Sequence, residues 1–104
     1  MSDHAFTMKL YPGARAEYQK RHDEIWPELE ALLRDAGIYD YWIFLDPATN
    51  VLFGHYKLKE HNTADDLPNH PLMQKWWDYM APLMETEPSN KPVQVELDAV
   101  FKMA

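Results

Sequence analysis

The sequence has no cysteine and only three glycines in 104 residues. The absence of cysteine excludes disulfide bonds, thiolate metal sites and cysteine nucleophiles. With so few glycines, no glycine-rich phosphate-binding loop is present. Nor does any apolar run approach the ~20 residues that a membrane-spanning helix needs. We therefore expect no thiol chemistry, no phosphate cradle and no transmembrane segment.

Positive charge is also scarce, since 10 Lys and Arg residues stand against 17 Asp and Glu residues. The formal net charge is -7 and the isoelectric point is about 5.0. An acidic surface repels nucleic-acid phosphates and anionic lipids, so we expect no nucleic-acid partner and no membrane partner. Residues 1–4 show neither the basic nor the apolar region of a secretion signal, and a cytoplasmic location is expected.

Aromatic residues, by contrast, are frequent, because Trp, Tyr and Phe make up 13% of the chain. Such side chains stabilise cores, and they also line pockets that bind sugars and other rings. The length predicts a single domain over residues 1–104, and 46% of hydrophobic residues can form its core. A domain of this size has little depth for a closed pocket, so an active site would gain from a second subunit.

Hydrophobic spacing predicts a strand and then a helix in the first half of the chain. Residues 5–10 alternate with a period of two, which is typical of a half-buried strand. Residues 14–36 carry one apolar stripe with helical spacing, and Gly37 is a suitable end for that helix. Pro27 removes a backbone donor inside this stretch, so the helix should kink or restart near Trp26.

The second half of the chain predicts three more strands and another helix. Residues 39–45 and 51–58 are rich in strand-forming side chains and flank a turn, as expected for an antiparallel hairpin. A second helix begins at Pro71, and apolar alternation over residues 93–101 predicts a final strand. The order β-α-β-β-α-β is that of the ferredoxin-like α+β fold, an antiparallel four-stranded sheet with two helices on one face.

The other face of such a sheet is left to water, to a ligand or to a partner. Both faces of the predicted strand at residues 39–45 carry large side chains, because Trp42 and Phe44 alternate with Tyr41 and Ile43. An uncovered aromatic face is an interaction surface. We therefore expect a homodimer in which two sheets pack face to face.

Tyr18 and His22 are candidate site residues on the first predicted helix. They are four residues apart and share the apolar face of that helix with Leu29 and Leu33. Polar groups on an apolar face either satisfy each other within the core or contact a ligand. The pattern alone leaves both interpretations open.

Trp76 and Trp77 are adjacent on the second predicted helix. Neighbouring helical residues point ~100° apart, so one indole can fill the core while the other lines a cavity. Periodicity by itself favours the core for both, and Tyr41 is similarly ambiguous. The histidines other than His22 have no spacing to carboxylates that is typical of a zinc or iron site, so we expect no metal.

Several segments, in order along essentially the whole chain, resemble the L-rhamnose mutarotase family. They are residues 17–22 (EYQKRH), residues 25–29 (IWPEL), Tyr41 with Leu45 and Asp46, Asn50 with Leu52 and Phe53, Trp76 and Trp77 with Tyr79 and Met80, and Glu96 and Leu97 with Val100 and Phe101. The resemblance implies a dimeric α+β barrel without a metal or an organic cofactor. It implies that His22 is the acid/base group, and that four aromatic residues contact the sugar: Tyr18, Tyr41, Trp76 and Trp77.

The activity that the resemblance implies is interconversion of the α and β anomers of L-rhamnopyranose. The reaction opens the sugar ring and closes it on the other face, and it needs only a group that takes and gives protons. An imidazole with an ordinary pKa of ~6.5 suits this task at neutral pH. Tyr41, a bound water or a residue of the partner chain could handle the second proton.

Two other functions remain open at this stage. The same dimeric fold supports cofactor-independent monooxygenases and haem-degrading enzymes, an interpretation that rests on fold analogy alone. The non-enzymatic alternative is a small dimer that binds a sugar and leaves the rate of anomer exchange at its background value.

Overall fold

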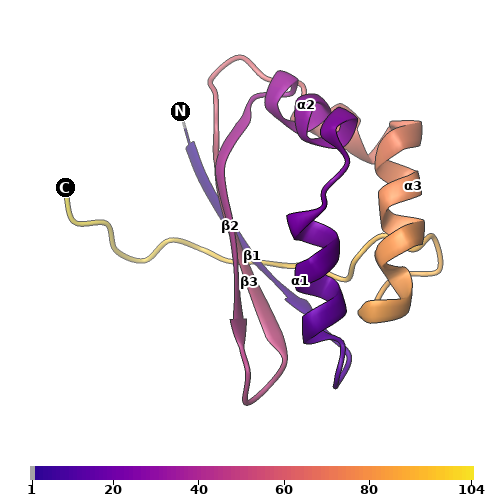
Figure 1. Cartoon of the computed structure of the whole chain (residues 1–104). Helices are drawn as coiled ribbons and strands as arrows, with labels where there is room; N and C mark the ends of the chain where they lie inside the picture. Colours follow the sequence, from indigo (N-terminus) through magenta and orange to yellow (C-terminus); the bar gives the residue numbers. More distant parts are fainter. Residues whose placement is uncertain (1) are drawn as a thin grey trace.

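A four-stranded antiparallel sheet carries the helices on one of its faces in the computed structural model, which describes residues 2–104 (Figure 1). In chain order the elements are β1 (Ser2–Lys9), α1 (Arg15–Asp23), α2 (Pro27–Asp35), β2 (Ile38–Asp46), β3 (Val51–Leu58), the 3-10 helix η1 (Ala64–Asn69), α3 (Pro71–Met80), the 3-10 helix η2 (Ala81–Leu83) and β4 (Val95–Glu96). The strand order is β2-β3-β1-β4, and all neighbouring pairs are antiparallel. The predicted ferredoxin-like α+β order is therefore confirmed.

The inner face of the sheet, which the helices cover, holds the core. Phe6 stands opposite Gly54 and Met8 stands opposite Leu52, so these residues point to the same side. A Cβ atom added at Gly54 would lie 2.3 Å from Cζ of Phe6, and only glycine leaves room for that ring. The buried core residues are Phe6, Met8, Leu10, Tyr18, Leu29, Leu52, Trp76, Met80 and Met84.

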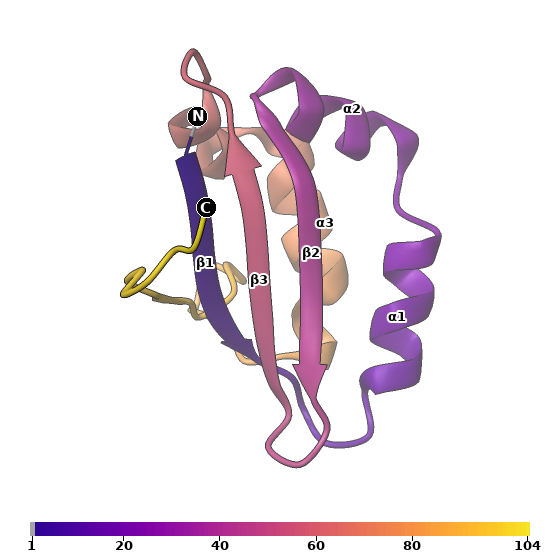
Figure 2. The same cartoon turned by 90° about the vertical axis from the view of Figure 1, so that its left-hand side faces the viewer.

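The first predicted helix is in fact two helices, α1 and α2. After α1, the Glu24 N–H donates to the carbonyl of Lys20, and α2 then begins with Pro27 at its first position. Proline suits that position because the missing N–H has no intrahelical partner there. The predicted restart near Trp26 is confirmed, and it leaves α1 beyond the β2 edge of the sheet (Figure 2). None of the helices within residues 2–104 is long and apolar enough to cross a membrane.

A bulge in β2 decides which of its side chains face inward. The register to β3 shifts just before Trp42, and Asp40 has a left-handed φ of 49°. Asp adopts this conformation more readily than most residues. The extra residue places both Ile38 and Tyr41 on the inner face, while Trp42 and Phe44 point outward.

The outer face of the sheet bears a group of exposed apolar side chains. Trp42 and Phe44 are 59% and 57% exposed, and their rings stack with centroids 5.5 Å apart. Phe53 stands opposite Phe44 on β3, and Val95 extends the group on β4. The predicted uncovered aromatic face is confirmed, and we call these four residues the outer apolar face.

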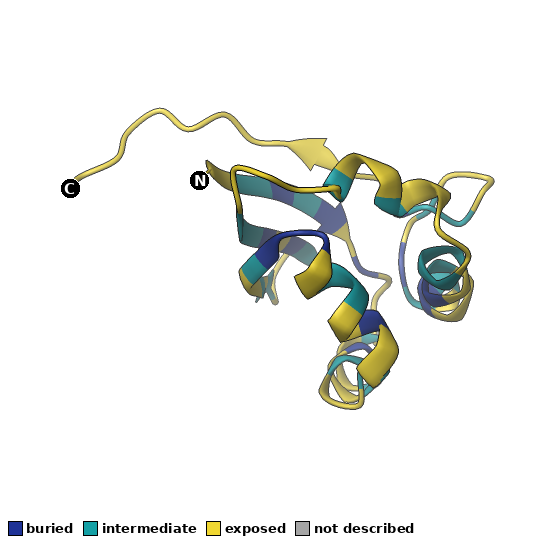
Figure 3. Ribbon diagram, turned by 90° about the horizontal axis from the view of Figure 1, so that it is seen from above, coloured by how far each residue is buried: buried dark blue, intermediate teal, exposed yellow. Residues whose placement is uncertain are grey.

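The prediction of a final strand over residues 93–101 is wrong for most of its length. β4 is limited to Val95 and Glu96, which pair with β1, and one further backbone bond joins the Leu97 N–H to the carbonyl of Ala5. Beyond it the chain runs away from the sheet on the side opposite the helices (Figures 1 and 3). Alternation determines which side chains share a face, but it does not supply a neighbouring strand for the backbone hydrogen bonds.

Candidate active site

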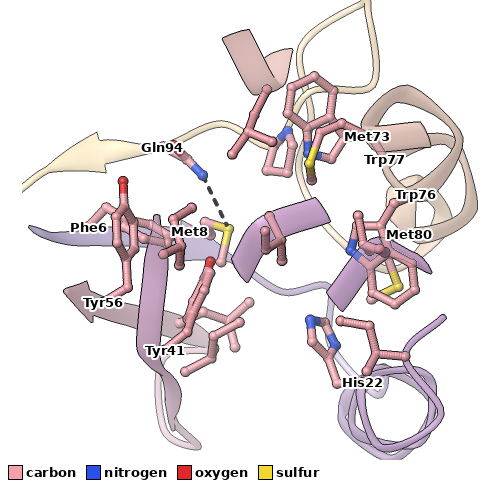
Figure 4. A pocket seen from close by; sticks show the side chains of 18 of the residues that line it. Phe6, Met8, His22, Tyr41, Tyr56, Met73, Trp76, Trp77, Met80 and Gln94 are labelled. Atoms are coloured by element: carbon pink, nitrogen blue, oxygen red, sulfur yellow. Dashed lines mark hydrogen bonds between the residues drawn. The ribbon is translucent and has the colours of Figure 1, made fainter. Parts of the chain in front are cut away.

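A pocket of about 1310 Å³ lies between the inner face of the sheet and the helices. Its walls come from β1, β2 and β3 on one side and from α1, α2 and α3 on the other. Figure 4 shows His22 and Trp76 on the helix side, with Tyr41 and Tyr56 across the open space on the sheet side. The pocket brings together all five residues that the sequence singled out: Tyr18, His22, Tyr41, Trp76 and Trp77.

Helix α1 fixes the orientation of the His22 ring. Nδ1 of His22 lies 3.0 Å from the backbone oxygen of Tyr18, one turn earlier, and the two rings are 4.4 Å apart between centroids. A carbonyl oxygen only accepts hydrogen bonds, so Nδ1 carries the hydrogen and donates it. In the neutral ring, Nε2 therefore keeps its lone pair and can accept a proton.

Burial determines the charge state of His22. It lowers the pKa of the ring below the ordinary value of 6.5, and this effect is larger than the opposing effects of the Tyr18 hydrogen bond and the charge of Asp23. The neutral, proton-accepting form is consequently the one that is populated at pH 7. His22 thus combines a fixed tautomer with the protonation state of a general base.

The two tryptophans of α3 differ in their surroundings. Trp76 is only 6% exposed, and its ring meets the rings of His22 and Trp26 edge-on at 5.4 and 5.1 Å. Trp77 is half-buried and lines another part of the pocket, beside Met73 (Figure 4). Periodicity favoured the core for both indoles, but both of them line the pocket, and only Trp76 is also part of the buried core.

A cluster of aromatic rings forms the sheet side of the pocket. Tyr41 lies 5.4 Å from Tyr56 and meets Phe6 edge-on at 6.2 Å between ring centroids. Although 40% of the Tyr41 surface is exposed, its hydroxyl points into the pocket (Figure 4). Burial, with the nearby hydroxyls of Tyr18 and Tyr56, raises the pKa of Tyr41, and burial also raises those of Tyr18 and Tyr56. All three phenols stay protonated at neutral pH and can donate hydrogen bonds.

The sequence did not single out three polar residues that line the pocket, namely Tyr56, Gln94 and Glu96. For Tyr56 a signal existed, because the alternation along β3 places it on the same face as Leu52. Glu96 pairs with Phe6 and lies close enough to Tyr56 to raise its pKa. Its position depends on where the short β4 pairs, which no local pattern revealed.

Acidic and histidine side chains do not gather into a ligand set in the described part of the chain. Within residues 2–104, no three or more His, Cys, Asp or Glu side chains are placed so that they could hold one metal ion. His22, Asp23 and Glu24 are consecutive on and after α1, and only His22 and Asp23 border the pocket. Independence from metals and cofactors stays a prediction.

Comparison with known proteins gives one consistent result. A sequence model of a family described as L-rhamnose mutarotase matches residues 3–103. The L-rhamnose mutarotase of Sinorhizobium fredii is 54% identical over 104 residues, which cover 100% of both chains. That of Mesorhizobium japonicum is 54% identical over 101 residues, which cover 97% of this chain and 96% of the relative. The crystal structure of an L-rhamnose mutarotase from Formosa agariphila matches with a TM-score of 0.94 and 43% identity, and covers 100% of each chain.

Proposed function

The chain belongs to the L-rhamnose mutarotase family, and on that premise we propose how it interconverts the α and β anomers of L-rhamnopyranose. In this proposal His22 moves the proton of the anomeric hydroxyl. The observation that carries the assignment is the hydrogen bond from Nδ1 to the Tyr18 carbonyl. It leaves Nε2 as the proton-accepting atom of a ring that borders the pocket.

The reaction proceeds by ring opening and reclosure. Nε2 of His22 takes the proton of the anomeric O–H, the electron pair of that O–H forms the carbonyl at C1, and the bond between C1 and the ring oxygen breaks. The ring oxygen takes up a proton as it leaves. After rotation about the C1–C2 bond, the ring hydroxyl adds to the opposite face of the carbonyl, and both proton transfers are reversed.

The proton for the ring oxygen needs a donor, and Tyr41 is our candidate within this chain. Burial raises its pKa, so its hydroxyl is protonated at neutral pH. It lies on the sheet side of the pocket, across from His22 (Figure 4). A bound water and a residue of a partner chain are the alternatives.

The apolar and polar walls of the pocket suit the two sides of a 6-deoxysugar. The indoles of Trp76 and Trp77 provide flat apolar surfaces for the C–H face and the methyl group. The hydroxyls of Tyr18 and Tyr41 provide hydrogen bonds to the sugar oxygens. We infer that these four side chains bind the substrate.

The assembly that we propose is a homodimer formed by the outer apolar faces of two sheets. It is supported by the exposed aromatic rings of Trp42 and Phe44, which no part of this chain covers within residues 2–104. We further propose a cytoplasmic location, in keeping with the metabolism of a free monosaccharide.

Anomer exchange measured by saturation-transfer NMR tests the role of His22. His22→Asn keeps a polar side chain of moderate size and removes the titrating ring. We expect the variant to stay folded by circular dichroism and to bind L-rhamnose, yet to exchange anomers at least ~10²-fold more slowly. The loss should appear in kcat more than in KM, because the proton moves only in the transition state.

The matched control is His61→Asn, which makes the same change at an exposed histidine outside the pocket. It should exchange anomers at the wild-type rate. All samples are first dialysed against EDTA, since we expect no metal to take part. A folded His22→Asn protein with most of the wild-type rate would remove His22 from the reaction, and binding of sugar without any faster exchange by the wild type would indicate a binding protein.

A further inference from the structure

Tyr56 of β3 borders the pocket, and neighbouring rings hold it in place. Alternation along β3 puts it on the inner face of the sheet, with Leu52. Its ring stacks on that of His4 at 5.2 Å and lies 5.4 Å from that of Tyr41, between centroids. Within residues 2–104, however, its hydroxyl makes no hydrogen bond to the rest of the chain. This hydroxyl is therefore free to bind a ligand.

We propose that Tyr56 is a specificity-determining residue that donates a hydrogen bond to the C4 hydroxyl of the sugar. The proposal rests on the proposed function, because the position of the anomeric centre at His22 decides which end of the sugar reaches Tyr56. Tyr56 moves no proton in the reaction. It selects pyranoses whose C4 hydroxyl has the orientation found in L-rhamnose.

The order of the strands places Tyr56 further from His22 than Tyr41. The helix α1, which carries His22, lies beyond the β2 edge of a sheet with the order β2-β3-β1-β4 (Figure 2). Tyr41 belongs to β2, and Tyr56 belongs to β3, which lies ~4.8 Å further from this edge. Figure 4 shows the same succession, with His22, Tyr41 and Tyr56 following one another across the pocket and the two phenol hydroxyls pointing the same way.

A pyranose ring that lies along this succession presents its C4 hydroxyl to Tyr56. In the proposed reaction C1 stands at His22, and the ring oxygen next to C1 faces Tyr41. C4 is the ring atom opposite C1, so its hydroxyl points away from His22 and toward the part of the pocket that β3 and β4 line. The C2 hydroxyl, next to C1, stays at the reacting end.

The chemistry of this end of the pocket suits a hydroxyl that both accepts and donates. Burial and the carboxylates of Glu96 and Asp65 raise the pKa of Tyr56, so its hydroxyl is protonated and can donate at neutral pH. Glu96 stands opposite Phe6 on β4 and borders the same pocket, and a carboxylate accepts hydrogen bonds. A sugar without the C4 hydroxyl would leave the Tyr56 donor unpaired, which is how a polar site rejects the wrong substrate.

Tyr56→Phe tests the proposal, because it removes the hydroxyl and keeps the ring with its contacts to His4 and Tyr41. We expect KM for L-rhamnose to rise ~3–10-fold, the usual effect of one hydrogen bond, while kcat is unchanged. For 4-deoxy-L-rhamnose, which lacks the C4 hydroxyl, KM should be the same in the variant and the wild type. Saturation-transfer NMR over a range of sugar concentrations measures both constants after subtraction of the uncatalysed exchange.

A second sugar and a second variant provide the matched controls. For 2-deoxy-L-rhamnose, which keeps the C4 hydroxyl, Tyr56→Phe should raise KM by the same factor as for L-rhamnose. Tyr11→Phe makes the same change at an exposed tyrosine outside the pocket and should leave KM for all three sugars at the wild-type values. The proposal is overturned if Tyr56→Phe leaves KM for L-rhamnose unchanged, or raises it equally for L-rhamnose and the 4-deoxy sugar.

Binding to the His22→Asn protein separates this proposal from the role of His22. In that background, Tyr56→Phe should raise the Kd for L-rhamnose ~3–10-fold and leave the Kd for the 4-deoxy sugar unchanged, which titration of the intrinsic fluorescence measures. If His22→Asn alone keeps full activity and this pattern still appears, the catalytic assignment fails and the contact to C4 stands. If His22→Asn is inactive and Tyr56→Phe changes neither Kd, the catalytic assignment stands and the contact to C4 is overturned.

Discussion

The charge of His22 is set by the competition between burial, which lowers its pKa, and a backbone hydrogen bond, which raises it. Burial has the larger effect, so the ring binds its proton less readily than an imidazole in water. The ring is therefore neutral at neutral pH and becomes charged only in acid. If His22 is the base of the reaction, as we propose, both turnover and stability should depend on pH.

Turnover should stay level around neutral pH and fall as the pH drops through the His22 pKa, which lies below 6.5. His22→Asn should lose this dependence.

Stability should follow the same direction, because the unfolded histidine takes up its proton first, near its ordinary pKa. The free energy of unfolding that this group contributes is thus complete above pH ~6.5 and declines as the pH falls toward the folded-state pKa. Anomer exchange and urea unfolding across the acidic range measure both, and a rate that rises on acidification would contradict the base role.

The neighbouring tryptophans should respond differently to truncation. Trp76→Ala removes a nearly fully buried indole and should lower the free energy of unfolding by ~3–5 kcal/mol. Trp77→Ala should cost less stability, because that ring is only half-buried, but it should weaken the binding of L-rhamnose. Urea unfolding and titration of the intrinsic fluorescence with L-rhamnose measure the two effects. If both variants bind the sugar normally, the indoles serve the core alone.

How far the sequence predicts this site differs from residue to residue. Tyr18 and His22 were visible because a polar pair on an apolar helical stripe is unusual, and the family resemblance then favoured a role in the site. The spacing could not show that the partner of Nδ1 is a backbone carbonyl, since this depends on the rotamer of the ring. The place of Glu96 in the pocket could not be predicted, because it depends on a long-range pairing with Phe6.

At the scale of elements, packing between β1 and β3 depends on a glycine, whose lack of a side chain leaves room for a ring on the neighbouring strand. Gly54 faces Phe6, and a Cβ atom there would overlap the phenyl ring at 2.3 Å from Cζ. Phe6 in turn meets Tyr41 in the wall of the pocket. The glycine therefore connects strand packing to the shape of the site.

Gly54→Ala should lower the free energy of unfolding by ~1–3 kcal/mol, the usual cost of an overpacked core. The control is the double variant Phe6→Leu with Gly54→Ala, in which the smaller side chain leaves room for the added methyl group. The double variant should be more stable than the sum of the two single effects predicts. Denaturant unfolding of the wild type, the two single variants and the double variant measures this difference. Additive effects would mean that the two residues do not compete for the same space.

The elements themselves were predictable where the chain carries its own signal. Pro27 predicted the restart of the helix, and the strand-forming side chains of residues 51–58, which follow a turn, predicted β3 with the bounds that the structure has. The bulge at Asp40 was not predicted, because a single left-handed residue leaves no periodic trace. The last strand was overestimated because residues 93–101 alternate as a strand would, while β1 pairs with only two of them.

At the scale of the whole molecule, the two faces of the sheet differ in what covers them. The inner face and the helices enclose the pocket, whereas the outer face exposes aromatic rings and lies on the side to which residues 97–104 extend (Figures 1 and 2). A small protein that left such a surface in water would tend to associate. In the homodimer that we propose, two-fold pairing of the outer apolar faces would cover the rings and leave both pockets on the outside of the assembly.

Light scattering at micromolar concentration should accordingly give twice the 12.3 kDa mass of one chain. Trp42→Glu together with Phe44→Glu places two charges on the outer apolar face, and burial of unpaired charges opposes association strongly. We expect this variant to be a folded monomer, because both side chains point away from the core. Tyr11→Glu is the control, since it adds a charge at another exposed aromatic residue outside that face and should stay dimeric. A wild type that scatters as a monomer, or a charged variant that stays dimeric, would show that the outer face is not the interface.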